Sequence, residues 1–294
     1  MGERMDWSRD LQDWPLNHLS RRIAHRPHLW HVQQTGTGDT ILLLHGAGAS
    51  THSWRAMIPL LAENHHVVAL DLPGQGFTRP GTRSRSGLNP MTEDIAALCA
   101  SQGWSPSCVI GHSAGGAIAL NLARSMPGVS AVVGINPALS RFDGVAGWLF
   151  PLLARFLALN PLTSYAFSAG GRPVERARRL LESTGSRLDE DGIAYYARLI
   201  SDRDHVEGTL QMMAQWNIDT MLAGLESISA PCLFLTGEND RAVAPRLAET
   251  ARDRMASAQV SQLRGVGHLA HEEAPSETAA RVLDWLGSFA PEAG

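Results

Sequence analysis

The sequence has few cysteines and no long hydrophobic run, and each absence excludes a class of protein. Only three cysteines occur in 294 residues, and each lies in an apolar segment. This odd, small number favours buried, reduced thiols in a cytoplasmic protein over a disulfide framework. Residues 1–20 mix charges with tryptophans and lack the apolar centre of a secretory signal. No run of about 18 uncharged apolar residues is present, so we expect no transmembrane helix.

An excess of charge of one sign is also missing. The chain has 25 basic and 29 acidic residues and a formal net charge of −4. A nucleic-acid partner normally requires a basic stripe, so no such partner is expected. Hydrophobic residues make up 44% of the chain, as in ordinary globular proteins, and no internal repeat is evident. A length of 294 residues predicts one large domain, or one domain with an insertion.

The most informative stretch is Gly111-His112-Ser113-Ala114-Gly115. A β-branched apolar run precedes it at 107–110, and residues 116–123 have helical periodicity. A strand that turns sharply into a helix, with serine at the corner, is the nucleophile elbow of α/β-hydrolases. The two glycines fit this interpretation, because a Cβ at either position would collide with the neighbouring element.

Strands and helices alternate along both ends of the chain. This pattern predicts an α/β-hydrolase fold, with a mostly parallel central sheet and helices on both faces. A turn-rich link at 34–39 predicts a hairpin between the first two strands, and Thr92 is placed as an N-cap. The predicted strands are 29–33, 40–44, 66–70, 107–110, 131–135, 232–236 and 259–263, and the predicted helices are 53–63, 92–102, 116–123, 244–255 and 276–289.

The alternation stops from about residue 140 to residue 223, where only helical patterns occur. We interpret 140–223 as a helical cap inserted between two parts of the core, 1–139 and 224–294. Such an insertion would cover the carboxyl ends of the strands, where sites of open α/β sheets lie. The cap includes a nearly uncharged run at 148–159, which favours a hydrophobic pocket. Candidate pocket residues are Trp54, Trp148, Met212, Met213 and Trp216.

A serine hydroxyl needs a base, and the base needs a carboxylate that orients it. In this fold the acid and the histidine follow the serine along the chain. Asp240 comes directly after an apolar strand, and His268 follows the last predicted strand, so both are expected at the same sheet edge as Ser113. Glu238 is a competing carboxylate. Asn136 occupies the position where some relatives have the acid, but its amide cannot act as a carboxylate.

The reaction also needs hydrogen-bond donors for the developing oxyanion. The backbone N–H of Ala114 lies at a helix start, where the helix dipole favours negative charge. The Gly-rich loop 45–50 makes the N–H of Ala47 the best second donor. This loop could instead serve only tight packing. A dinucleotide site does not fit, because the third glycine of its fingerprint is missing.

Other chemistry at these loops is disfavoured. His268 and His271 could suggest a metal pair, but a third ligand at compatible spacing is missing, so neither metal nor cofactor is expected. The segment 71–76, which begins with Asp71, more plausibly shapes its loop than performs chemistry. Serine at the elbow also argues against epoxide-hydrolase or dehalogenase chemistry, which uses a carboxylate nucleophile in this fold.

Taken together, the chain resembles a branch of the α/β-hydrolase superfamily, the magnesium-chelatase accessory proteins of bacteriochlorophyll biosynthesis. The resemblance implies a role near magnesium insertion into protoporphyrin in photosynthetic bacteria, with a tetrapyrrole and chelatase subunits as possible partners. It spans nearly the whole chain, including the expected cap. The stretches that match are MDWSRDLQDWP, WHVQQTGTG, LLLHGAGASTHSWR, DLPGQGFT, GHSAGGAIAL, LFPLLARFLALNP, TGSRLDEDGIAYYARL, DHVEGTLQMMAQW and GVGHLAHEE.

Three functions are compatible with these observations. The first is a serine hydrolase that forms an acyl-enzyme on Ser113 from an ester-like, fairly apolar substrate. The second is a non-catalytic accessory that keeps the scaffold and binds a porphyrin or the chelatase. The third is a cofactor-free C–C bond hydrolase. An intact Ser-Asp-His set favours catalysis, although fold alone does not decide function.

Overall fold

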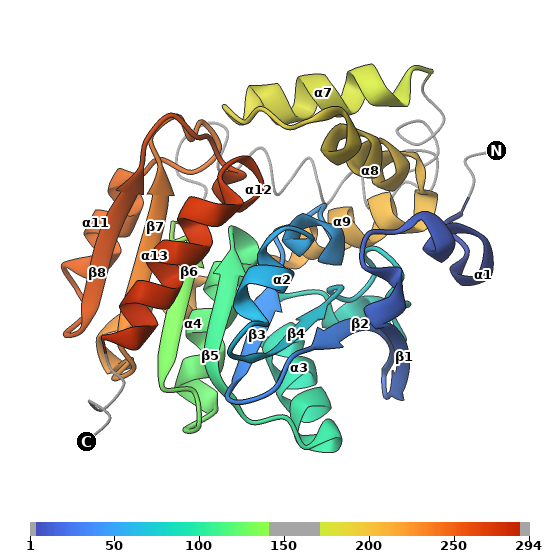
Figure 1. Cartoon of the computed structure of the whole chain (residues 1–294). Helices are drawn as coiled ribbons and strands as arrows, with labels where there is room; N and C mark the ends of the chain where they lie inside the picture. The colour runs from blue at the N-terminus through green and yellow to red at the C-terminus, as the bar shows by residue number, and fades with distance from the viewer. Residues whose placement is uncertain (1–3, 141–170, 289–294) are drawn as a thin grey trace.

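A twisted eight-stranded sheet forms the centre of the chain in a computed structural model that describes residues 4–140 and 171–288 (Figure 1). The strand order is β1-β2-β4-β3-β5-β6-β7-β8. Strand β2 runs antiparallel to both of its neighbours, and every adjacent pair from β4 to β8 is parallel. This is the α/β-hydrolase fold that the sequence predicts.

The central strands are almost entirely apolar because helices cover both faces of the sheet. Every residue of β6 is buried, as is every residue of β7. The strands are β1 (Ser20–His25), β2 (His28–Thr35), β3 (Thr40–Leu44), β4 (His66–Leu70), β5 (Pro106–His112), β6 (Ala131–Ile135), β7 (Cys232–Gly237) and β8 (Ala258–Leu263).

Two hydrophobic layers hold the helices against the sheet. One layer joins it to α2 (Met57–Leu61) and α13 (Pro275–Gly287), and the other to α3 (Leu88–Gln102), α4 (Ala114–Ser125) and α11 (Arg246–Arg252). Shorter elements complete the core: α1 (Trp7–Asp10), α12 (Ala270–Glu273), and the 3-10 turns η1 (Leu11–Asp13), η2 (Asn17–Leu19), η3 (Thr51–Trp54), η4 (Arg83–Arg85) and η5 (Leu225–Ser227).

The described part of the expected insertion is helical. It contains α7 (Pro173–Ser183), α8 (Glu190–Ser201), α9 (Arg203–Gln215) and α10 (Asp219–Ala223). Aspartate side chains cap α8 and α9 at their N-termini. Helices α7 and α8 lie across one edge of the sheet (Figure 1). The run 148–159, with Trp148, lies outside the described residues, and the limits 1–139, 140–223 and 224–294 remain a prediction.

The predicted hairpin between the first two strands is wrong. Strand β4 lies between β2 and β3 and pairs with both, so the link 34–39 crosses over a strand. Strand β1, which pairs with β2 as the first strand of the sheet, was also not predicted. Only Ile23 of that strand is buried. A six-residue edge strand with one buried side chain gives too weak an alternation to be recognised.

Two helix starts also differ from the prediction. Helix α3 begins at Leu88, and Thr92 is not its N-cap but an interior residue whose hydroxyl donates to the Leu88 carbonyl at 2.9 Å. The expected helix 53–63 is divided into η3 and the shorter α2. Pro59 explains the division, because proline lacks an N–H and fits only the first turn of a helix.

The three cysteines are free and buried, as the sequence predicts. Burial raises the pKa of the Cys108 thiol to about 12, so it stays protonated and unreactive. Among residues 4–140 and 171–288, none of the helices has both the length and the apolar character needed to cross a membrane.

Candidate active site

Strand β5 turns into α4 at Ser113, as the nucleophile elbow requires. The backbone of Ser113 has φ +51° and ψ −115°, a strained conformation for a residue with a side chain. A Cβ on Gly111 would lie 2.1 Å from the Gly115 carbonyl oxygen, and one on Gly115 would lie 2.1 Å from the Leu44 carbonyl oxygen. Both positions therefore demand glycine, as predicted from the motif.

The predicted acid and base form a buried pair. Asp240 follows β7, and its Oδ2 accepts a hydrogen bond from His268 Nδ1 at 2.8 Å. Its Oδ1 accepts from the backbone N–H groups of Ala242 and Val243 at 2.7 and 2.8 Å. These three bonds fix the carboxylate. The bond to His268 also assigns the proton of the neutral imidazole to Nδ1, which leaves Nε2 as a proton acceptor.

Glu238, the competing carboxylate, is exposed and does not reach the imidazole. Its Oε2 accepts from the Gly265 N–H at 2.8 Å and so ties together the turns after β7 and β8. The geometry therefore favours Asp240 as the partner of His268.

Two residues at neighbouring strand ends hold the His268 backbone in place. Asn136, which follows β6 with φ +44°, donates from Nδ2 to the Gly267 and His268 carbonyls at 3.1 and 2.8 Å. Its Oδ1 accepts from the Gly237 N–H at 2.7 Å. His112 donates from Nε2 to the His268 carbonyl at 2.9 Å. Neither role was predicted from the sequence, although a polar residue at a strand end was the available signal.

Ser113 follows directly after His112, a residue that contacts His268. The ring of the preceding residue, His112, is centred 4.7 Å from the His268 ring. Within the described residues 4–140 and 171–288, no hydrogen bond joins the Ser113 hydroxyl to the His268 imidazole. Bonds of this kind often form only when substrate is bound, so the arrangement remains compatible with proton transfer.

The two predicted oxyanion donors have free N–H groups. Within the described part of the chain, neither the Ala47 nor the Ala114 amide has an acceptor. The loop that contains Ala47 reaches the elbow, since a Cβ on Gly46 would lie 3.1 Å from the Ser113 Cβ. The same loop is held by the Gln75 side chain, which accepts from the Gly48 N–H at 2.7 Å.

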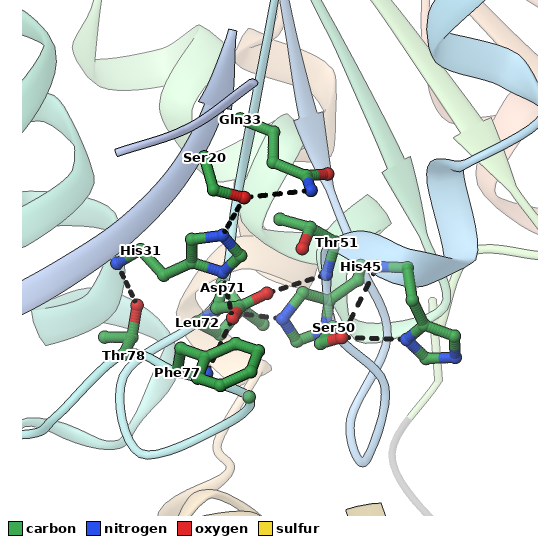
Figure 2. A network of polar contacts seen from close by, with 12 residues as sticks. Ser20, His31, Gln33, His45, Ser50, Thr51, Asp71, Leu72, Phe77 and Thr78 are labelled. Atoms are coloured by element: carbon green, nitrogen blue, oxygen red, sulfur yellow. Dashed lines mark hydrogen bonds and ion pairs between the residues drawn. The ribbon is translucent and has the colours of Figure 1, made fainter. Parts of the chain in front are cut away.

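A buried carboxylate organises the loops around this region (Figure 2). Asp71 accepts from His31 Nδ1 at 2.6 Å and from the Thr51 and Phe77 N–H groups at 2.7 and 2.8 Å. Burial acts to raise the pKa of Asp71, but His31 and these hydrogen bonds outweigh it and lower the pKa to about 2. Asp71 therefore shapes its loop, in line with the interpretation from sequence.

A second buried carboxylate joins the insertion to the core, and no local sequence pattern predicts this contact. Glu272 lies four residues after His268, and its side chain accepts from Arg55 of the core at 2.5 Å and from the Tyr196 hydroxyl of α8 at 2.7 Å. Burial raises the pKa of Glu272 to about 7, although both partners favour its charged form.

The ring of His271 lies between those of Trp54 and His112, and burial lowers the pKa of His271 to about 3.

The candidate pocket residues do not form one wall. Trp54 has no exposed area and packs in the core, and Met212 is also buried, with its sulfur accepting from Gln75. Met213 and Trp216 are half-buried on or next to α9. Trp148 lies outside the described residues. The structure thus brings Ser113, Asp240 and His268 to one edge and leaves the pocket as a prediction.

Comparison with known proteins agrees with the fold. A family model described as the alpha/beta hydrolase family matches residues 41–281. The chain belongs to this family. It is also 44% identical over 276 residues to the magnesium-chelatase 30 kDa subunit of Rhodobacter capsulatus, an alignment that covers 93% of this chain and 96% of that protein. The resemblance inferred from sequence is therefore confirmed.

More distant relatives share the fold. The pimeloyl-[acyl-carrier protein] methyl ester esterase of Stenotrophomonas maltophilia is 23% identical, over 90% of this chain and 99% of that enzyme. Among solved structures, the epoxide hydrolase CorEH matches with a TM-score of 0.78 at 20% identity, covering 92% of this chain and 99% of that one. A thermophilic esterase from Thermogutta terrifontis matches with a TM-score of 0.74 at 22% identity, covering 92% and 98%.

Proposed function

We propose that the chain is a serine hydrolase that acts on ester-like, fairly apolar substrates through Ser113, His268 and Asp240. The observation that supports this most strongly is the 2.8 Å hydrogen bond between Asp240 and His268, at the same sheet edge as the strained serine. A protein that only binds a partner has no physical need for this acid–base pair beside a nucleophile elbow.

In this mechanism the Ser113 Oγ attacks the ester carbonyl carbon while its proton moves to Nε2 of His268. The carbonyl oxygen becomes an oxyanion that accepts hydrogen bonds from the Ala47 and Ala114 N–H groups. Asp240 stabilises the imidazolium through its bond to Nδ1. Collapse of the intermediate breaks the bond to the leaving oxygen, which takes the proton from His268 and departs as an alcohol.

Water completes the cycle. A water molecule attacks the acyl-serine carbonyl and transfers a proton to His268. Collapse of this second intermediate breaks the bond to Ser113, which recovers its proton as the carboxylic acid leaves. Both half-reactions use the same donors, so the mechanism needs no metal ion or organic cofactor.

The physiological setting is proposed from the Rhodobacter relative, whose name makes it a subunit of magnesium chelatase. Identity of 44% along nearly the full length of both chains supports a similar role here. We place the hydrolase beside magnesium insertion into a tetrapyrrole, with chelatase subunits as partners.

A second candidate is a non-catalytic accessory that binds a porphyrin or the chelatase through the same scaffold. Among the described residues, the missing hydrogen bond between Ser113 and His268 is the observation that favours it. A titration with protoporphyrin followed by absorbance tests this candidate. Unchanged spectra at micromolar protein would count against it.

Ester hydrolysis tests the first candidate. The wild type should hydrolyse p-nitrophenyl esters, and Ser113→Ala should lose this activity while melting at a similar temperature. Ser125→Ala, on the exposed last turn of α4, is a matched control that should retain it. Equal rates for the wild type and Ser113→Ala would reject Ser113 as the nucleophile.

A further inference from the structure

One cavity is lined by residues other than the predicted catalytic ones. We propose that Arg22 and Arg79 form a binding site there for an organic anion with a carboxylate or phosphate group. This site is independent of the proposed hydrolysis, because neither Ser113, Asp240 nor His268 lines it.

The cavity has a volume of about 340 Å³ and is partly open to the surface. Arg22 of β1, Ser86 and three segments that are distant in sequence line it. The three segments are the N-terminal residues before α1, the loop between β4 and η4, and helix α9 of the insertion. Met5, Phe77 and Pro80 provide apolar surface. Gly74 and Gly208 bring the loop and the helix into close backbone contact, since a Cβ on Gly208 would lie 1.9 Å from the Gly74 carbonyl oxygen.

Two exposed guanidinium groups line this cavity without a direct ion pair among the described residues. Arg22 comes from β1, and its guanidinium carbon lies 4.6 Å from the centre of the Trp7 ring. Arg79 comes from the loop between β4 and η4, and its backbone pairs with Leu29 of β2 in an isolated β-bridge. In the part of the chain that the structure describes, neither side chain makes an ion pair or hydrogen bond.

Arg22 and Arg79 line the same cavity, and their like charges repel each other. Burial, and next the charge of Arg79, lower the pKa of Arg22, while Asp6 partly offsets them. An anion placed between the two groups would relieve this repulsion. Guanidinium groups suit carboxylate and phosphate oxygens, which they can bind through two parallel hydrogen bonds.

The acidic residues of the cavity are already engaged. Asp202 accepts from the Met5 and His205 N–H groups at the start of α9. Asp204 forms an ion pair with Arg4 at 3.2 Å. Glu207 also has an interaction partner. Asp202 and Asp204 therefore do not engage Arg22 or Arg79, whose N–H donors stay available to a ligand.

The cavity also contains a buried hydroxyl suited to such a ligand. Ser86 is 3% exposed, lines the cavity, and its hydroxyl has no hydrogen-bond partner among the described residues. A charged head held by two arginines and one hydroxyl, with an apolar body against Phe77, would use the chemistry of the whole cavity. The expected ligand is thus a small organic anion.

Calorimetric titration of the full chain with 3-phenylpropionate and with phenyl phosphate tests the proposal, because the two probes share a ring and differ in the anionic head. We expect at least one to bind, and Arg22→Gln and Arg79→Gln each to weaken that binding by about tenfold or more. Arg21→Gln is the matched control. Its side chain points to the opposite face of β1 and does not line the cavity.

Each outcome decides the question. Binding of one probe only identifies the head group, and binding of both supports a general anion site. Ser113→Ala should bind as tightly as the wild type, so failure of the hydrolase proposal leaves this test intact. Absence of binding at about 10 mM of either probe overturns the proposal. Equal weakening by Arg21→Gln does so too, because it would indicate nonspecific charge attraction. Melting curves verify that each variant is folded.

Discussion

The Asp240 carboxylate uses both of its oxygens, and the two make different contributions. Oδ1 accepts two backbone N–H groups and fixes the turn after β7, while Oδ2 holds the imidazole. A substitution that removes only the second interaction separates catalysis from folding.

Asp240→Asn is such a substitution. The amide oxygen can still accept from Ala242 and Val243, but the amide nitrogen cannot accept the His268 Nδ1 proton, so the ring would favour the wrong tautomer. We expect kcat/KM for ester hydrolysis to fall by about 10³- to 10⁴-fold with little change in melting temperature. Glu238→Gln is the control and should retain most activity. A loss below about tenfold would exclude Asp240 from the proposed role.

The contacts of Asn136 explain why an amide, and not a carboxylate, follows β6. Its Nδ2 faces two carbonyl oxygens, and a carboxylate there would present negative charge to both. We expect Asn136→Asp to lose about 1–3 kcal/mol of unfolding free energy at neutral pH and less in acid, where the carboxyl is protonated. Urea denaturation at two pH values measures this. Asn89→Asp, on an exposed residue of α3, should show no such loss.

At the scale of secondary structure, local sequence patterns predicted where strands begin and end better than they predicted which strands pair with each other. The bounds of β4 and β6 agree with the predicted ranges because each is a short, continuous apolar run between polar residues. The pairing of β2 with β4 was missed because strand order depends on tertiary packing, which no local pattern records. Likewise, Thr92 has the chemistry of an N-cap and still lies within α3.

The contact of α9 with the core depends on Gly208. Alanine in a helix normally stabilises by about 1 kcal/mol relative to glycine, but here its Cβ would meet the Gly74 carbonyl oxygen. We therefore expect Gly208→Ala to destabilise the protein by about 1–3 kcal/mol in chemical denaturation. Gly287→Ala, at the end of α13 with open space around it, should be neutral or stabilising. A stabilising Gly208→Ala would contradict the described contact.

At the scale of the whole molecule, the buried Glu272 links the insertion to the core and makes stability depend on pH. Its folded pKa of about 7 exceeds the ordinary glutamate value of 4.5, so the folded state holds this proton more tightly. The resulting stabilisation is complete below pH 4.5 and is lost as pH rises to about 7, on the order of 3 kcal/mol. Buried His271 and His45 have lowered pKa values and act in the opposite direction, since they must bind protons on acid unfolding.

Comparison with Glu272→Gln isolates the carboxyl from these histidines. The variant leaves Arg55 with only its longer ion pair to Asp189 at 3.6 Å and should be less stable overall, but it should lack the decline between pH 4.5 and 7 that Glu272 causes. Unfolding free energies of both proteins across this interval give the two slopes. Parallel slopes would show that Glu272 does not titrate there.

The sequence alone predicted the fold class and the residues gathered at the sheet edge, since the glycine motif, the strand ends and the order of Ser113, Asp240 and His268 are local features. It could not reveal the side chains that support them. Asn136, His112 and Arg55 act through partners about 100 or more residues away, and such contacts become visible only when the chain is folded.

The most direct test of the account is covalent labelling. A fluorophosphonate reacts with a serine only when a neighbouring base activates it, so it reports whether the Ser113 hydroxyl and the imidazole act together. We predict one adduct per wild-type chain, located on Ser113 by peptide mass spectrometry and absent from both Ser113→Ala and His268→Ala. An unlabelled wild-type protein, or an adduct on another serine, would contradict the proposed hydrolase.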